Sequence, residues 1–210
     1  MLNQAEIDRL LETGNWLVRM DNEGVSYAGF RWEPLDKWTT APDWEDKAEC
    51  GNGLHGQNAK GHGYCQGGTR LVLCETKGDQ VIIDKDKVKV KYAKIIAINE
   101  DIPPQFLELC SLDLRNYQHP LPAGLKSVGG YLDLSNYQHP LPAGLKSVGG
   151  SLYLRNYQHP LPAGLKSVGG SLDLSNYQHP LPAGPKSVGG DLDLRNYQHP
   201  LPAGLKKKKR

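Results

Sequence analysis

Residues 111–130 read SLDLRNYQHPLPAGLKSVGG, and this twenty-residue pattern returns four more times, nearly unchanged, before the chain ends at residue 210. A fixed period of this length is typical of repeat proteins in which each unit packs against its neighbours. Within a unit, leucines such as Leu112 and Leu114 alternate with polar residues, which is how a short strand buries one face. We therefore expect residues 111–206 to form a β-solenoid of five coils.

The rest of each unit predicts how one coil closes. Pro120 and Pro122 fix φ and remove two backbone donors, so this side should run extended and outside any central strand. Gly129 and Gly130 allow a sharp turn into the next strand. Stacked coils place like side chains in columns. Two such columns are the asparagines Asn116, Asn136, Asn156, Asn176 and Asn196 and the tyrosines Tyr117, Tyr137, Tyr157, Tyr177 and Tyr197.

The order L-P-x-x-L-x-x-V followed by L-x-L-x-N resembles the bacterial leucine-rich repeat with a 20-residue unit, over residues 111–206. The resemblance implies a solenoid whose strand face binds protein partners. The gap from Val128 to Leu132 is one residue longer than in that family, and the gap from Leu114 to Asn116 is one shorter. A curved horseshoe and a straighter β-helix therefore both stay open.

Residues 1–110 predict a small α+β domain that caps the solenoid. Asn3 followed by Glu6 is typical of a helix start, and Gly14 of a helix end, which predicts a helix over residues 4–13. A second short helix, 105–109, should follow two prolines and dock on the first coil. The strand-like runs are 16–20, 25–31, 70–75, 80–83, 88–92 and 94–98, with turns expected at 77–79 and 84–86.

The two halves differ in charge. Residues 1–110 carry 13 basic and 18 acidic residues, whereas residues 111–210 carry 12 and 5. The last five residues, from Lys206 to Arg210, are all basic, and 207–210 form a tail beyond the repeats. Lysines at an open strand edge discourage end-to-end stacking of coils. The same charges could instead hold a nucleic-acid backbone weakly.

Cysteine usage and hydropathy predict a cytoplasmic protein. The four cysteines are too few and too irregularly spaced for a disulfide framework, and the chain opens without a charged and then apolar leader. No apolar run approaches the roughly 20 residues that a membrane-spanning helix needs. We therefore expect no contact with a membrane.

One stretch of the N-terminal half is dense in chemically active residues. Cys50, His55, His62 and Cys65 offer two thiolates and two imidazoles, all of them zinc ligands, although a glycine-rich loop with incidental Cys and His explains them as well. The alternatives are thus a zinc site and no cofactor. The motifs A-P-D-W, C-G-N-G-L-H-G and K-V-K-V resemble a domain, covering residues 27–98, that recurs in uncharacterised bacterial and phage proteins. That resemblance implies a domain boundary near residue 110 and no catalytic residue.

Catalysis needs a nucleophile with a positioned base, or paired carboxylates in a cleft, and the sequence shows neither. Our leading hypothesis is a non-enzymatic protein-interaction scaffold, such as a host-directed factor of a phage or bacterium. Two alternatives are an enzyme or a small-ligand or nucleotide-binding domain in residues 1–110, and a self-assembling fibre element. The expected binding residues lie in the Trp-rich loop and on the solenoid: Trp38, Trp44, Arg115, Tyr117, Arg155, Tyr157, Arg195 and Tyr197.

Overall fold

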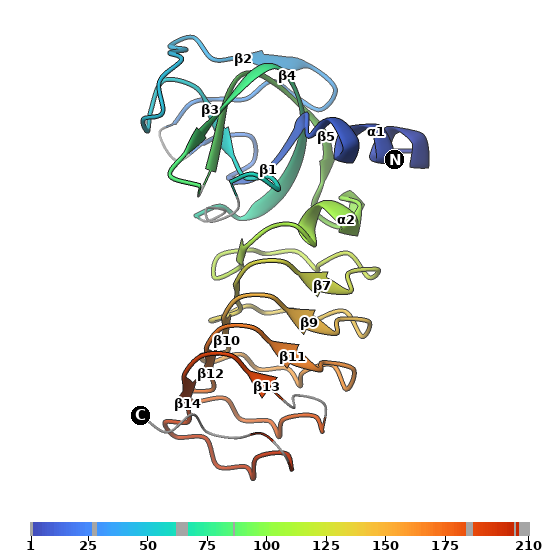
Figure 1. The fold of residues 1–210 in the computed structure, drawn as a ribbon, viewed down its shortest axis with the longest axis vertical. Helices are drawn as coiled ribbons and strands as arrows, with labels where there is room; N and C mark the ends of the chain where they lie inside the picture. Colours follow the sequence, from blue (N-terminus) through green and yellow to red (C-terminus); the bar gives the residue numbers. More distant parts are fainter. Residues whose placement is uncertain are drawn as a thin grey trace.

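The computed structural model describes residues 2–26, 29–61, 67–85, 87–183, 187–203 and 205. A small unit of helices and antiparallel strands sits on one end of a parallel β-solenoid of about four turns (Figure 1). This architecture confirms the fold class expected from the sequence. Within the described residues, no helix has both the length and the apolar composition needed to cross a membrane.

Helix α1 (Gln4–Thr13) begins and ends where its capping residues predict. The Asn3 side chain accepts a hydrogen bond from the Glu6 amide (3.0 Å), and the Glu6 carboxylate accepts one from the Asn3 amide (2.8 Å). Gly14 ends the helix with a φ of 67°, a conformation that glycine adopts without strain. Ile7 and Leu10 are buried and attach the helix to the sheet.

The N-terminal sheet contains five strands: β1 (Trp16–Asp21), β2 (Trp38–Thr40), β3 (Leu54–Gly56), β4 (Arg70–Ile83) and β5 (Lys87–Ile98), the last followed by the 3-10 turn η1 (Asn99–Asp101). The turn predicted at 77–79 is wrong, because β4 runs through it with only a register shift between Lys77 and Gln80. The predicted runs 88–92 and 94–98 likewise form one strand. Over 25–31, the described residues make only isolated bridges, from Val25 to Asn22 and to Arg31.

The N-terminal sheet closes on itself. Its strands run in the order β1-β4-β5, β3 pairs with β5, and the chain just after β3 returns to β1, where Val18 and Gln57 exchange two backbone hydrogen bonds of 2.8 Å. Side chains alternate along β1, so Leu17 and Arg19 face the inside of this ring of strands. Trp16 and the other alternate residues face outward and pack toward the helices and the solenoid.

In the solenoid, each repeat contributes short strands to two parallel sheets. One sheet contains β6 (Leu112–Asp113), β8 (Leu132–Asp133), β10 (Leu152–Tyr153), β12 (Leu172–Asp173) and β14 (Leu192–Asp193). The other contains β7 (Ser127–Val128), β9 (Ser147–Val148), β11 (Ser167–Val168) and β13 (Ser187–Val188). Equivalent residues pair directly, so that Leu152 lies between Leu132 and Leu172. The predicted in-register columns are therefore present.

A buried column of tyrosines supports the proline-rich side of the coils. Neighbouring rings stack with centroids 6.1 to 6.4 Å apart and planes within 15° of parallel. The Tyr157 hydroxyl donates to the His139 carbonyl (3.1 Å) and accepts from the Leu141 amide (3.1 Å). Leu141 stands between two prolines, so the hydroxyl satisfies backbone groups that no strand pairs. Burial raises the pKa of Tyr157 to about 12.

The N-terminal unit covers the first coil and shares its core. One buried apolar cluster runs from Ile7 through the short helix α2 (Pro104–Leu107) into the coils, as far as Leu205. The Gln57 side chain donates to the Ser111 carbonyl (2.6 Å) and accepts from the Ser111 amide (3.1 Å). It thereby replaces the two bonds that a preceding coil supplies elsewhere: the Leu152 amide donates to the Ser171 carbonyl, and the Ser151 hydroxyl accepts from the Ser171 amide. The first coil consequently has a partner on both sides.

Candidate functional site

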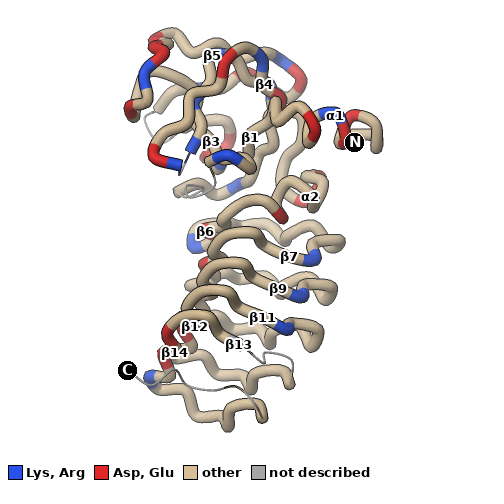
Figure 2. The backbone as a smooth tube through the Cα atoms, in the orientation of Figure 1, with Lys and Arg blue, Asp and Glu red and all other residues tan. Residues whose placement is uncertain are grey.

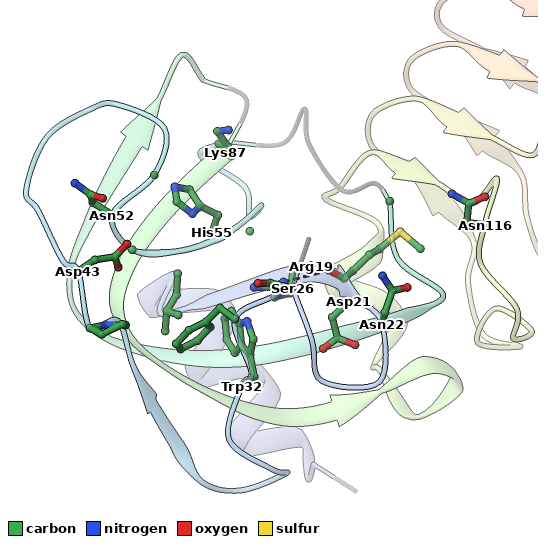
Figure 3. Close-up of a pocket in the computed structure, with 18 of the residues that line it drawn as sticks. Arg19, Asp21, Asn22, Ser26, Trp32, Asp43, Asn52, His55, Lys87 and Asn116 are labelled. Atoms are coloured by element: carbon green, nitrogen blue, oxygen red, sulfur yellow. Dashed lines mark hydrogen bonds between the residues drawn. The ribbon is translucent and has the colours of Figure 1, made fainter. Parts of the chain in front are cut away.

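A cavity of about 590 Å³ opens at the mouth of the ring of strands and faces the first coil (Figure 3). Its apolar wall includes Phe30, Trp32 and Leu54. Asn22 and Asn52 add amide groups at its edge. Cavities of this size, mostly apolar with a few polar groups, are typical of sites for small molecules. We refer to this cavity as the junction cleft.

The solenoid supplies one side of the junction cleft. Arg115 and Asn116 of the first coil line it, and Asn116 lies across the opening from the N-terminal unit in Figure 3. The same two residues also line a shallower hollow of about 390 Å³ that continues along the coils to Gln118 and Gln138. The cleft therefore depends on how the two parts of the chain meet.

Trp32 brings an unsatisfied hydrogen-bond donor to the cleft. Its side chain is only 3% exposed, and the Arg19 guanidinium lies 4.1 Å from the ring centroid, covering one face. The indole Nε1 is buried and has no hydrogen-bond partner among the described residues. An indole N–H can only donate, and leaving a buried donor unpaired costs about 1–3 kcal/mol. A ligand with an acceptor atom would remove this cost.

His55 of β3 lies on the opposite side of the cleft from Trp32, close to Lys87 (Figure 3). Burial, followed by the positive charges of Lys87, Lys89 and Arg19, lowers the pKa of His55 from 6.5 to about 4. The ring is consequently neutral at neutral pH. Its Nε2 is buried and has no hydrogen-bond partner among the residues that the structure describes.

Two buried polar atoms of the cleft thus have no hydrogen-bond partner among the described residues. One is the indole nitrogen of Trp32, which can only donate. The other is Nε2 of His55, which donates or accepts according to which ring nitrogen carries the proton.

An ion pair fixes the wall of the cleft beside the ring. The Asp21 carboxylate is buried, and Arg70 donates two hydrogen bonds to it. The same carboxylate accepts from the Gly24 amide (3.2 Å), which holds the turn after β1. The hydrogen bonds to Asp21 raise the pKa of Arg70. The negative charge of Asp21 is therefore already balanced, and it is not available to a cation in the cleft.

The structure describes only two of the four residues predicted to bind zinc. Cys50 is exposed and does not line the cleft, whereas His55 does. His62 and Cys65 lie outside the described residues. Among the residues that are described, no three or more His, Cys, Asp or Glu side chains gather in a way that could hold a metal ion. Zinc binding stays a prediction.

The predicted binding residues of the Trp-rich loop lie outside the cleft. The Lys77 amine lies 4.1 Å from the centroid of the Trp38 ring, and the Lys89 amine lies 5.7 Å from that of Trp44. Both tryptophans are half-buried. Such cation–π contacts fasten the loop to the sheet. A binding role for these two residues stays a prediction.

On the solenoid, the predicted arginines and tyrosines lie on different sides of the coil wall. Arg115, Arg155 and Arg195 are exposed. Tyr117 and Tyr157 are buried in the stacked column, and Tyr197 is half-buried at its end. Because these rings face one another, a partner at the surface would meet the arginines first. Residues 206–210 of the predicted basic tail lie outside the described residues.

On the strand face of the solenoid, arginine and serine alternate from coil to coil, and the aspartate column is interrupted in the third coil. Arg115 and Arg195 each pair with the aspartate two residues earlier, Asp113 and Asp193. In the third coil Tyr153 replaces that aspartate, and Arg155 has no ion-pair partner within the described part of the chain. Figure 2 shows the charged residues of the coils in two groups, lysines beside β7, β9 and β11, and mixed charges beside the other sheet.

Sequence reasoning missed most of the cleft. It took His55 as one of four candidate zinc ligands and gave no binding role to Trp32 or Arg19. One available signal was the position of Arg19 inside the otherwise apolar run 16–20, where a charge on the inner face calls for a special environment. No family model, curated protein or solved structure matches this chain.

Proposed function

We propose that this chain is a non-enzymatic binding protein whose ligand site is the junction cleft and whose solenoid is the supporting scaffold. The unpaired buried donor of Trp32, next to a cavity of about 590 Å³, is the observation that carries the proposal. Folded proteins satisfy nearly all buried polar groups, so an exception in a cavity favours a missing partner. This proposal develops the small-ligand alternative that the sequence left open.

The chemistry of His55 favours recognition over catalysis. With a pKa of about 4, the ring is a weak base, and general-base catalysis at neutral pH works best with a pKa near 7. Its Nε2, which has no partner among the described residues, can still form a hydrogen bond with a ligand. The scaffold role of the coils is supported by the core that they share with the N-terminal unit.

Occupation of the junction cleft can be tested with the fluorescent anion 8-anilinonaphthalene-1-sulfonate. Calorimetry of the full chain should give one saturable site. Ser26→Trp, which places a large side chain in the cleft, should abolish that binding. Gln105→Trp, on the exposed side of α2, is the matched control and should bind like the original protein. Equal binding by Ser26→Trp and Gln105→Trp would show that the cleft is not the site.

A second candidate function, our leading hypothesis from the sequence, is the binding of a protein partner by the strand face of the solenoid. The break at Tyr153 and Arg155 supports it, because tyrosine and arginine dominate the energetics of many protein interfaces. Both residues sit in the middle coil, where a partner has surface on either side. In this proposal the coils act as those of a leucine-rich repeat protein, in a cytoplasmic, host-directed factor of a phage or bacterium.

Affinity capture with the full chain tests the second candidate. Tyr153→Asp restores the aspartate of the other coils and gives Arg155 a partner, so it should release a captured protein. Gln158→Ala changes an exposed residue on the proline side of the same coil and should have no effect. Capture that is insensitive to Tyr153→Asp would place the interface elsewhere.

A further inference from the structure

We infer that the ligand of the junction cleft is a small organic anion built on a flat aromatic ring, with a carboxylate or phosphate group that accepts a hydrogen bond from Trp32. This inference rests on the proposed function and specifies the class of molecule bound. Three properties of the cleft lead to it: the shape and polarity of its wall, the hydrogen-bonding type of Trp32, and the sign of the surrounding charge.

The wall of the cleft suits a ring. Phe30, Leu54 and Met20 contribute apolar surface, and the ring of Trp32 closes one side. Glycines at Gly53 and Gly56 keep the neighbouring strand close, because a Cβ on either would collide with Lys89 or Leu17. A cavity of about 590 Å³ accommodates a molecule of the size of a fused aromatic ring system with one acidic group.

Trp32 requires an acceptor from the ligand. Its N–H is a donor only, so an ammonium or amidinium group facing it would leave both donors unpaired. Carboxylate and phosphate oxygens at neutral pH act as strong acceptors, and hydrogen bonds to charged acceptors are stronger than those to neutral ones. The hydrogen-bonding type of Trp32 therefore favours an anion over a cation.

The charge around the cleft also favours an anion. Lys87 and Arg19 line it, while Arg115 is paired with Asp113 and the Asp21 carboxylate is bonded to Arg70. Asp43 lies at the exposed edge. Burial is the main cause of the low pKa of His55, and the positive charges of Lys87, Lys89 and Arg19 lower it further. An anionic group bound there would be attracted to the same charges that disfavour protonation of His55.

The test compares matched probes on the full chain by isothermal titration calorimetry. 2-Naphthoate and 2-naphthamide have the same flat ring and differ in charge. AMP and adenosine make the same comparison for a phosphate, and inorganic phosphate shows whether the ring is needed. We expect at least one anion, 2-naphthoate or AMP, to bind about tenfold or more tightly than its neutral counterpart, the difference expected for one hydrogen bond to a charged group.

Variants assign the interaction to Trp32. Trp32→Phe keeps an aromatic ring and removes the N–H, so it should weaken anion binding about tenfold and weaken the neutral probe by a smaller factor, because its acceptor is uncharged. Trp38→Phe makes the same change outside the cleft and should alter neither. Equal binding of charged and neutral probes, or insensitivity of the anion to Trp32→Phe, would overturn the inference while the cleft stayed a binding site. Failure of the sulfonate probe and of all five molecules would overturn the proposed function itself.

Discussion

Replacing Gly149 with alanine tests how closely the coils approach one another. Gly149 donates a backbone hydrogen bond to the Val128 carbonyl (2.8 Å), and a Cβ added to it would lie well inside van der Waals contact with the Gly129 carbonyl oxygen. That oxygen belongs to the backbone of the preceding coil and cannot rotate away. The added methyl group must therefore push two coils apart.

The expected loss of stability follows from two contributions. Overpacking of a tight contact costs about 1–3 kcal/mol. Weakening the Gly149–Val128 hydrogen bond adds about 1 kcal/mol. We thus expect Gly149→Ala to lower the free energy of unfolding by about 2–4 kcal/mol, the sum of the two. This is a large fraction of the 5–15 kcal/mol that stabilises a typical domain.

Gly144 in the same repeat provides the control. A Cβ there would lie 3.8 Å from the Leu125 carbonyl oxygen, an ordinary contact. Gly144→Ala should therefore leave stability unchanged or raise it by up to about 1 kcal/mol, through the lower entropy of the unfolded chain. Urea unfolding followed by circular dichroism measures both variants. If the two alanine variants unfold within about 0.5 kcal/mol of each other, the usual span for harmless surface changes, the coils are not in this close contact.

Three further predictions concern single side chains. Tyr157→Phe removes the hydroxyl that bonds Leu141 and His139, and should cost about 1–3 kcal/mol in urea unfolding because a buried amide loses its partner. Gln57→Leu should cost a similar amount, since both bonds to Ser111 are lost, and amide hydrogen exchange should accelerate in the first coil before the others. His55 has a folded pKa of about 4, below its ordinary 6.5. Its contribution to stability is therefore full above pH 6.5 and lost as pH falls toward 4, by about 1–2 kcal/mol after allowance for solvent screening; the melting temperature of His55→Gln should fall less over that interval.

The sequence predicts the solenoid well because every repeat has leucines at the same positions, and these leucines must be buried in the same way. Leu132 and its equivalents must be buried, a single coil cannot bury them, and the fixed period leaves stacking in register as the solution. The tyrosine column follows from the same repetition. The hydrogen bond from the Leu141 amide to the Tyr157 hydroxyl could not be predicted in this way, because it joins a side chain to the backbone of the preceding coil.

The N-terminal unit is harder to predict, since its decisive contacts are between distant segments. β2 and β3 have three residues each, too few for a periodic pattern. The Lys77-Gly78-Asp79 segment has the composition of a turn, yet pairing with β5 keeps it within a strand. The cleft joins Arg19, Trp32, His55 and Asn116. Closure of the ring onto β1 and docking of the first coil bring these positions together.

The stack of coils has two unlike ends. Gln57 and α2 cover the first coil, whereas in the described part of the chain no strand lies beyond β14, and Leu192 and Leu194 are less buried than their equivalents. A filament of stacked copies forms when the last coil of one copy pairs with the first coil of the next. Here the first coil is already covered by the N-terminal unit of its own molecule. Head-to-tail stacking of one copy on the first coil of another is therefore blocked by the N-terminal unit of the same molecule.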